Sequence, residues 1–319
     1  MHRREFLIGC GTACVFSKSS MAQSVTIAGR TFSSPTNFIE QGLRCGTPEP
    51  AAVTRTQSTR AFRAFRNLQV PFSEIITIPV HFHVIHSGDD GKVSESMITA
   101  QIDVLNSAYQ SANLQFRKAS TEYVDNSEWY EIGPPPVNPF ATNKEADMKR
   151  ALGKEQTSAL NCYILKCQNS LLGWATFPWE LSIDLARDGV VILNDSLPGG
   201  GASPFNLGHT ATHEIGHWLG MFHTFQGGCD EPGDAVGDTP FEDSPANGCP
   251  PQRDSCVSAG SDPINNYMDY SDDSCMNQFT TEQISRMRAF IALFRQGLVP
   301  PPTVGRLNLR TRLRTILVD

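Results

Sequence analysis

Two histidines four residues apart, His213 and His217, lie in the run HEIGHWLGMFH, whose last residue is His223. On a helix, positions i and i+4 share one face, so both imidazoles can bind one cation. Gly220 allows the chain to leave the helix and bring His223 round as a third nitrogen ligand. Three protein ligands leave one position for water, as in catalytic rather than structural zinc sites. Glu214 can reach that water without binding the metal, so the run predicts metal-assisted hydrolysis.

The segments around this run predict the elements that position it. A strand is expected over 75–85, a helix over 97–114, short strands at 114–116, 160–165, 173–177 and 190–193, the histidine helix over 206–221, and a last helix after Thr280. Residues 222–265 show little periodicity. This order predicts an α+β fold with a mixed twisted sheet and two main helices in its N-terminal half. An irregular half follows, and the metal is expected in the cleft between the two halves.

Both ends of the chain differ in composition from its body. Arg3-Arg4 precede an apolar stretch, and Ser20-Met21-Ala22 offers a cleavage site, so residues 1–22 are predicted to be a signal peptide, of the twin-arginine type. The alternative is a lipobox ending at Cys10, which would give a lipid-anchored protein. No apolar run is long enough to span a bilayer, so we expect a protein that is secreted or periplasmic, without stable membrane insertion.

Residues 23–66 are polar, are interrupted by three prolines, and end in a basic stretch, so they are predicted to be a detachable segment rather than part of a core. Cleavage near Arg60–Arg66 would release them. We expect the catalytic domain over 67–297 and a basic C-terminal tail over 298–319, whose purpose the sequence does not reveal.

The charge distribution argues against a nucleic-acid partner. Residues 61–296 carry fifteen Lys/Arg against twenty-nine Asp/Glu, a net charge of 15 − 29 = −14. Residues 228–275 contain eleven of these acids, opposed only by Arg253. Such a density in a loop favours a bound cation.

The nine cysteines and the other histidines need separate explanations. The four cysteines at 229, 249, 256 and 275 are expected to form disulfides in the irregular half, because an exported chain enters an oxidising environment. Cys162 and Cys167 either pair with each other or stay as buried thiols. Cys45 then remains as a single cysteine without a disulfide partner. His81, His83 and His86 are expected to pack or face solvent rather than bind a second metal. Gly199–Gly201 lacks the Lys of a phosphate loop and is predicted to be a connector.

Several separated motifs over about residues 75–296 resemble the pappalysin family of metzincin peptidases. They include TAT before the histidine run and HTF at its end, GC at 228–229, DTP at 238–240, and the run NYMDYSDDSCM at 266–276. Met268 in that last run fits the methionine turn beneath a metzincin metal.

The resemblance implies a role for each matching residue. His213, His217 and His223 would bind zinc, Glu214 would be general base and then acid, and Tyr270 would stabilise the oxyanion. Asp273 would form the floor of the pocket for the residue after the scissile bond, favouring cleavage before Arg or Lys. The implied disulfides are Cys229–Cys256 and Cys249–Cys275, and calcium is implied in the 229–239 loop, with Asp234 and Asp238 as our choice of ligands. Arg44-Cys45-Gly46-Thr47 resembles a latency motif in which the Cys45 thiolate takes the fourth zinc position.

The sequence thus predicts a secreted zinc endopeptidase made as a latent zymogen, monomeric, acting on protein or peptide substrates. One alternative is a non-catalytic exported metal-binding module that binds partners. Another is a hydrolase of non-peptide amides. A binding module would be expected to have lost the base or a ligand, and neither is lost.

Overall fold

A computed structural model describes residues 24–66, 74–135 and 143–299. The expected signal peptide and all but the first two residues of the expected tail lie outside these ranges. The strands are β1 Val25–Ile27, β2 Arg30–Phe32, β3 Ile76–His86, β4 Leu114–Asp125, β5 Glu131–Ile132, β6 Leu160–Cys167, β7 Gly173–Ala175 and β8 Val190–Leu193. The α-helices are α1 Pro35–Glu40, α2 Ala52–Arg66, α3 Glu95–Ala108, α4 Ser127–Tyr130, α5 Lys144–Leu152, α6 His209–Trp218 and α7 Thr281–Phe294.

The main sheet is mixed, as expected. Its order is β4-β3-β6-β8-β7, with β5 pairing to β6 off this path. All neighbours are parallel except β7, which runs antiparallel to β8 at one edge. β3 and β6 are buried along most of their length, because a central parallel strand is covered on both faces. The histidine helix α6 lies beside both the edge strand β7 and its neighbour β8.

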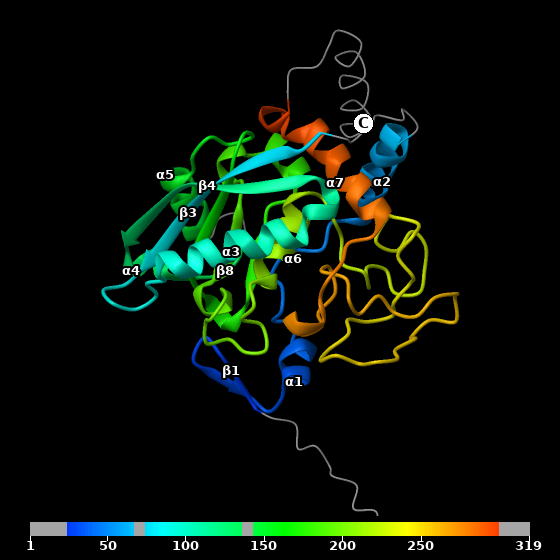
Figure 1. Cartoon of the computed structure of the whole chain (residues 1–319), viewed down its shortest axis with the longest axis horizontal. Helices are drawn as coiled ribbons and strands as arrows, with labels where there is room; N and C mark the ends of the chain where they lie inside the picture. The colour runs from blue at the N-terminus through cyan, green and yellow to red at the C-terminus, as the bar shows by residue number, and fades with distance from the viewer. Residues whose placement is uncertain (1–23, 67–73, 136–142, 300–319) are drawn as a thin grey trace, which may run out of the picture.

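Helices cover both faces of this sheet (Figure 1). Residues of α3, α6 and α7 share one apolar core with alternate residues of β3, β6 and β8. Met148 of α5 belongs to a second core on the other face, with Tyr163 and Trp174. Because strand side chains alternate between faces, each central strand contributes to both cores. Among the described residues, no helix is both long and apolar enough to cross a membrane.

The half that follows α6 is irregular, as the lack of periodicity predicted. Between α6 and α7 the chain forms loops and turns with one short 3-10 turn, Asp273–Cys275. Two disulfides, Cys229–Cys256 and Cys249–Cys275, join these loops. They make up the lower right of Figure 1. Cys162 and Cys167 are buried free thiols, so of the two alternatives the local bridge is not formed.

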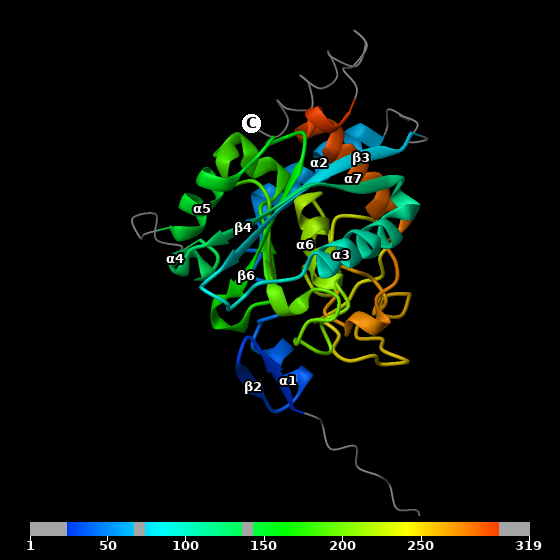
Figure 2. The same ribbon diagram turned by 60° about the vertical axis from the view of Figure 1, so that its left-hand side comes forward.

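The N-terminal segment 24–66 departs from expectation, because it contributes to the core. β1 and β2 form an antiparallel hairpin, and α1 follows it. Ile27 and Phe38 are fully buried in the core that contains Tyr270. α2 lies beside α7 in both views (Figures 1 and 2), with Phe62 buried against Phe290. The prolines and polar residues of the segment obscured these separated apolar positions.

Several element boundaries also differ from those expected. The α6 helix spans His209–Trp218, shorter than 206–221, because it starts after Gly208 and ends before Gly220, both at positive φ. β4 extends to Asp125, well beyond 116, because it pairs with the whole of β3. His83 is buried, stacks on Tyr163, and lies within hydrogen-bond distance of Glu122 and Asn161. It therefore packs, as predicted, rather than joining the three-histidine cluster.

Candidate active site

The α6 helix presents its two histidines to the interior, and the turn after it adds the third. His213 and His217 lie one turn apart and are buried. Gly220 adopts φ +92°, a conformation that side chains resist, and a Cβ there would meet the Phe290 ring. The chain therefore reverses at this glycine and carries His223 back to the same point.

The three imidazoles converge through their Nε2 atoms. His217 Nε2 lies 3.2 Å from His213 Nε2 and 3.1 Å from His223 Nε2. Two backbone carbonyls accept from the opposite side of the rings, Tyr267 O from His213 Nδ1 at 2.7 Å and Met221 O from His217 Nδ1 at 2.9 Å. These bonds place the protons on Nδ1. The Nε2 lone pairs of His213 and His217 therefore face one another, an arrangement that a shared cation stabilises.

Cys45, from the N-terminal segment, completes this cluster. Its Sγ lies 3.6 Å from His217 Nε2, and the four donor atoms all lie within 4.8 Å of one another. Tetrahedral zinc with ordinary bond lengths separates two nitrogens by about 3.3 Å and a nitrogen from a sulfur by about 3.6 Å. The donor set and its spacing fit a zinc ion, with Cys45 in the fourth position.

Burial sets the protonation states in this cluster. It lowers the pKa of His217 to about 4 and those of His213 and His223 well below their usual value, so all three rings are neutral. Burial, and then the Glu214 carboxylate, raise the pKa of Cys45 well above its usual value. Neutral imidazoles are the form that binds metals, and a thiolate at this position requires a cation as its partner.

Glu214 lies beside the cluster with one oxygen engaged. Its Oε2 accepts from Thr47 Oγ1 at 2.8 Å, and its Oε1 is buried without a hydrogen-bond partner among the described residues. Burial raises the pKa of Glu214 to about 7. A carboxyl group with this pKa can both take and return a proton near neutral pH. Gly173 makes room for it, because a Cβ there would touch Glu214 Cγ at 3.0 Å.

Tyr270 and Met268 lie on the turn that passes beneath the helix. The Tyr270 hydroxyl is 3.2 Å from His223 Nε2, at the rim of the histidine cluster. Met268 is fully buried. Its sulfur packs so closely on α6 that a Cβ at Gly216 would overlap it. The histidine helix is thus supported at a position that only glycine can occupy.

We predict that Gly216→Ala lowers the free energy of unfolding by about 2 kcal/mol, because the added methyl overpacks the Met268 contact. Thermal unfolding with metal analysis would measure this. Gly201→Ala is the matched control, since the nearest atom to its Cβ is Asp195 Cγ at 3.7 Å. Equal stability of the two variants would contradict the close packing.

Asp273 and Arg44 form a buried ion pair next to the cluster. Arg44 Nη2 lies 3.4 Å from Asp273 Oδ1, and Arg44 Nη1 donates to Thr210 Oγ1 at 2.8 Å. Asp273 Oδ2 accepts from the backbone amides of Leu207 and His209, at the start of α6. Burial raises the pKa of Asp273, and Arg44 opposes that shift. The carboxylate floor proposed from the sequence therefore contacts a basic side chain of this same chain.

The N-terminal segment runs along the edge strand β7. Leu172 N donates to Leu43 O at 3.2 Å, Gly46 N donates to Gly173 O at 2.8 Å, and Ala175 N donates to Thr47 Oγ1 at 2.9 Å. The paired residue numbers rise together, so the segment is parallel to β7. It occupies the backbone groups that an unpaired edge strand would offer to an extended peptide.

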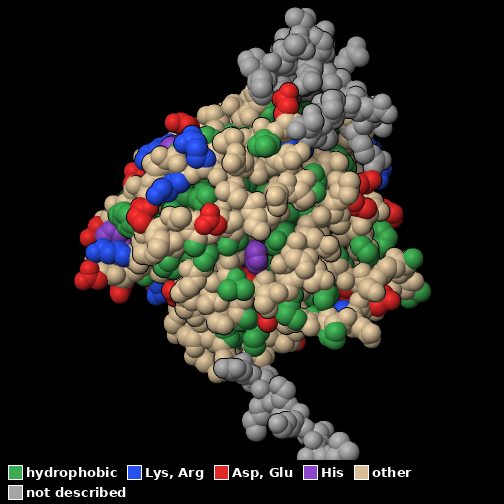
Figure 3. All heavy atoms as spheres, in the orientation of Figure 1, with side chains coloured by type: hydrophobic (Ala, Val, Ile, Leu, Met, Phe, Trp, Pro, Cys, Tyr) green, Lys and Arg blue, Asp and Glu red, His purple; other side chains and the backbone are tan. Residues whose placement is uncertain are grey.

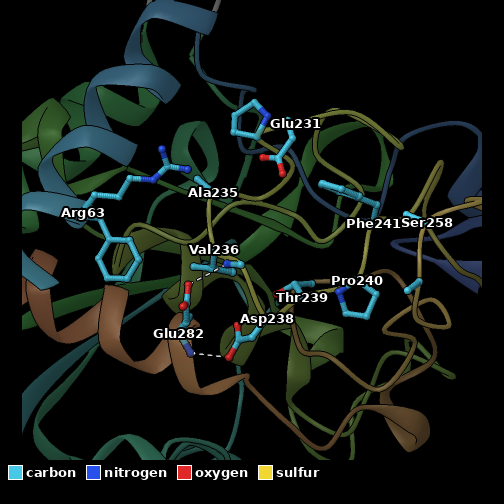
Figure 4. Close-up of a pocket in the computed structure, with 14 residues that line it drawn as sticks. Arg63, Glu231, Ala235, Val236, Asp238, Thr239, Pro240, Phe241, Ser258 and Glu282 are labelled. Carbon is cyan, nitrogen blue, oxygen red and sulfur yellow. Dashed lines mark hydrogen bonds between the residues drawn. The ribbon is translucent and has the colours of Figure 1, made fainter.

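Of the two acids chosen as calcium ligands, Asp238 lines a separate cavity of about 490 Å³ (Figure 4). Both Asp238 oxygens accept bonds at the start of α7, from Thr280 Oγ1 and Glu282 N. Asp234 is buried, and burial raises its pKa to about 7. Within the described ranges, the grouping of metal-binding side chains that the structure forms is the Cys45–histidine cluster. Asp238 is therefore engaged at the start of α7, and Asp234 Oδ1 accepts from Val236 N at 3.3 Å.

Sequence reasoning missed several residues that support the site. Thr47 bonds Glu214, although it was noted only as part of a motif. Asp188, Trp218 and Arg295 form a buried network in which Asp188 accepts from both other side chains. Nothing local identified this network, because Asp188 and Arg295 are 107 residues apart.

Comparisons with known proteins agree with this geometry. The family model described as pregnancy-associated plasma protein-A, Peptidase_M43, matches residues 146–292. Extracellular metalloprotease 1 of Coccidioides posadasii is 43% identical over 263 residues, covering 79% of this chain and 90% of that protein. An extracellular metalloprotease of Neurospora crassa is 46% identical over 222 residues, covering 67% and 74%.

Two solved structures are similar as well. A mutant of Tannerella forsythia promirolysin superposes with a TM-score of 0.67 at 27% identity, covering 80% of this chain and 96% of its own. Mature mirolysin in complex with a cleaved peptide gives a TM-score of 0.58 at 28% identity, covering 72% and 100%.

Proposed function

The chain belongs to the pappalysin family of metzincins and is an extracellular metalloprotease, and from this premise we propose that it is a zinc endopeptidase whose residues 23–66 keep it latent. The observation that carries the proposal is the convergence of Cys45 and three buried histidines beside Glu214. Digestion of casein by the processed protein, with fragments identified by mass spectrometry, tests it. Intact casein would refute the peptidase and leave the non-peptide amide hydrolase as the alternative.

We assign the chemistry to residues as follows. Bound zinc supplies a Lewis acid that lowers the pKa of water and polarises a carbonyl oxygen. Glu214, with its free Oε1, takes a proton from the attacking water and delivers it to the leaving amine. The Tyr270 hydroxyl, at the rim of the cluster, donates to the oxygen that gains charge. His213, His217 and His223 would hold the metal, and the carbonyl partners of the first two fix the orientation of their rings.

The contacts of Cys45 and Thr47 support latency. Cys45 lies where the fourth ligand belongs, and Thr47 engages the catalytic carboxylate. The segment therefore opposes both the entry of water and the action of the base. The likeness to promirolysin covers 80% of the chain, against 72% for the mature form, which is in keeping with a prosegment.

The Arg44–Asp273 pair supports a preference for cleavage before Arg or Lys. Asp273 is buried at the start of α6, and its nearest cation is the Arg44 guanidinium, which also lies over the Phe205 ring. A buried carboxylate without a cationic partner is costly. A substrate that supplies a guanidinium to pair with it is therefore strongly preferred over one that does not. Once Arg44 leaves, a substrate side chain of the same charge can take its place.

We expect Asp273→Asn in the processed enzyme to lower kcat/KM by about 100-fold for a peptide with Arg after the scissile bond, because a charged hydrogen bond is lost. A peptide with Leu at that position should change little. Asp272→Asn is the neighbouring control, and thermal unfolding checks the start of α6. A parallel loss for both peptides would show a structural effect rather than a specificity role.

Calcium in the 229–239 loop remains a proposal with narrower support. Asp234 is the candidate ligand, because its buried carboxylate would gain from a divalent cation. Asp238 is already engaged by α7, so carbonyl oxygens would have to complete the site. Metal analysis of Asp234→Asn against the parent protein tests this.

The remaining assignments concern the domain boundaries, the oligomeric state and the class of substrate. We propose a signal peptide over 1–22, a catalytic domain over 67–297, a tail over 298–319 and a monomer acting on proteins or peptides. In Figure 3, Lys and Arg side chains on the face drawn lie mostly beside Asp and Glu, and do not form a continuous basic surface. This supports a protein or peptide substrate over nucleic acid. The family relationship favours the enzyme over the non-catalytic module.

A further inference from the structure

The helix α2 is attached to the catalytic half through α7. Phe62 and Phe65 are 2% and 5% exposed, and they pack with Phe290 and Leu293 of α7. α2 and α7 lie side by side in Figures 1 and 2. This amphipathic face buries two aromatic side chains, which are the residues that dominate docking interfaces.

A buried arginine of α7 strengthens this attachment. Arg286 donates from Nη2 to Ser58 Oγ at 3.1 Å and from Nε to Gly220 O at 2.9 Å. Its guanidinium also lies over the Phe62 and Phe290 rings. α2 therefore supplies partners to a buried cation that also holds the turn after the histidine helix. Losing α2 would leave that cation with fewer partners.

The other end of the segment is attached separately. Phe38 of α1 is fully buried, and its ring lies 5.4 Å from the Phe205 ring. Thr36, also on α1, donates to Asn247 Oδ1 at 2.8 Å. Residues 24–66 are thus held on both sides of Cys45, through contacts that involve neither the metal ligands nor a thiol.

We propose that residues 24–66 stay docked over the three histidines after the chain is cut between Arg66 and Glu74, so that they persist as a non-covalent inhibitor. This inference rests on the proposed latency. Release then requires a second cut inside α2. Arg60 and Arg63 are exposed on that helix, and Arg63 extends beside the cavity of Figure 4. Hydrolysis before Arg60 separates Ser58 from Phe62, and hydrolysis before Arg63 separates Phe62 from Phe65. Either cut divides the set of side chains that attach α2 to α7.

The test uses the full chain carrying Glu214→Ala, which prevents autolysis, with the recognition sequence of a site-specific protease in place of residues 67–73. After the cut, size-exclusion chromatography measures how fast the N-terminal fragment leaves. We expect added Cys45→Ala to change the dissociation rate less than about tenfold, and Phe62→Ala with Phe65→Ala to raise it at least about 100-fold. Val53→Ala, exposed on the same helix, is the matched control.

Immediate loss of the fragment in the Cys45→Ala protein would overturn the proposal, as would equal rates for the double phenylalanine variant and Val53→Ala. Thermal unfolding before the cut confirms that each variant folds, and Phe65→Ala alone replaces the double variant if it does not. The same recognition sequence in the chain with Glu214 intact separates docking from latency. A retained fragment with full peptidase activity would refute latency alone, whereas loss of the N-terminal fragment in intact form, without a cut inside α2, would refute docking.

Discussion

Glu214→Ala is expected to lower kcat by at least about 10³-fold while the protein keeps its zinc, because this carboxyl group transfers protons but does not bind the metal. Its Oε1 has no partner among the described residues, and burial raises its pKa to about 7. Both properties suit a group that must take a proton from water and then return it. Steady-state hydrolysis of a peptide by protein from which residues 23–66 have been removed, together with metal analysis, measures the effect.

The same variant should also accumulate as the uncut chain, since release of residues 23–66 is expected to depend on the enzyme's own activity. Glu155→Ala is a suitable control, because that glutamate is 61% exposed and lies away from the cluster. Normal turnover in Glu214→Ala would refute the assignment of the base. Loss of both zinc and activity would instead indicate that Glu214 supports the metal site.

Removing the metal should have a comparable effect. A chelator applied to the processed protein is expected to lower activity at least about 10³-fold, since a catalytic metal supplies several kcal/mol of transition-state stabilisation. One equivalent of Zn²⁺ should restore it. His217→Ala should bind zinc poorly, because His217 Nε2 lies within 3.2 Å of both other ring nitrogens. Metal content and peptide hydrolysis are the measurements.

A histidine of the same helix provides the control for this prediction. His209 is buried enough that its pKa falls to about 4, yet its ring is not among the four donors. His209→Ala should therefore keep zinc and most activity. Active protein that is free of metal and indifferent to chelators would contradict the whole assignment of the site.

Local patterns in the sequence were sufficient for the chemistry and for much of the fold. The i, i+4 spacing of His213 and His217 is a property of one helix, so no tertiary contact is needed to infer that both bind the same metal ion. The helix expected after Thr280 is α7, and Thr280 and Gln283 form a capping box at its start. The absence of periodicity after His223 likewise predicted an irregular half, because regular elements need a repeating apolar face.

The tertiary structure decided what the N-terminal segment contacts. Phe38 and Phe62 are isolated apolar residues in a polar stretch, and no local pattern reveals that Phe205 and Phe290 complete their cores. The Arg44–Asp273 pair joins residues 229 positions apart. Such contacts depend on how separate elements pack, whereas ligand spacing depends only on the geometry of one helix. The metal site could therefore be inferred from sequence, whereas the docking of residues 24–66 over it could not.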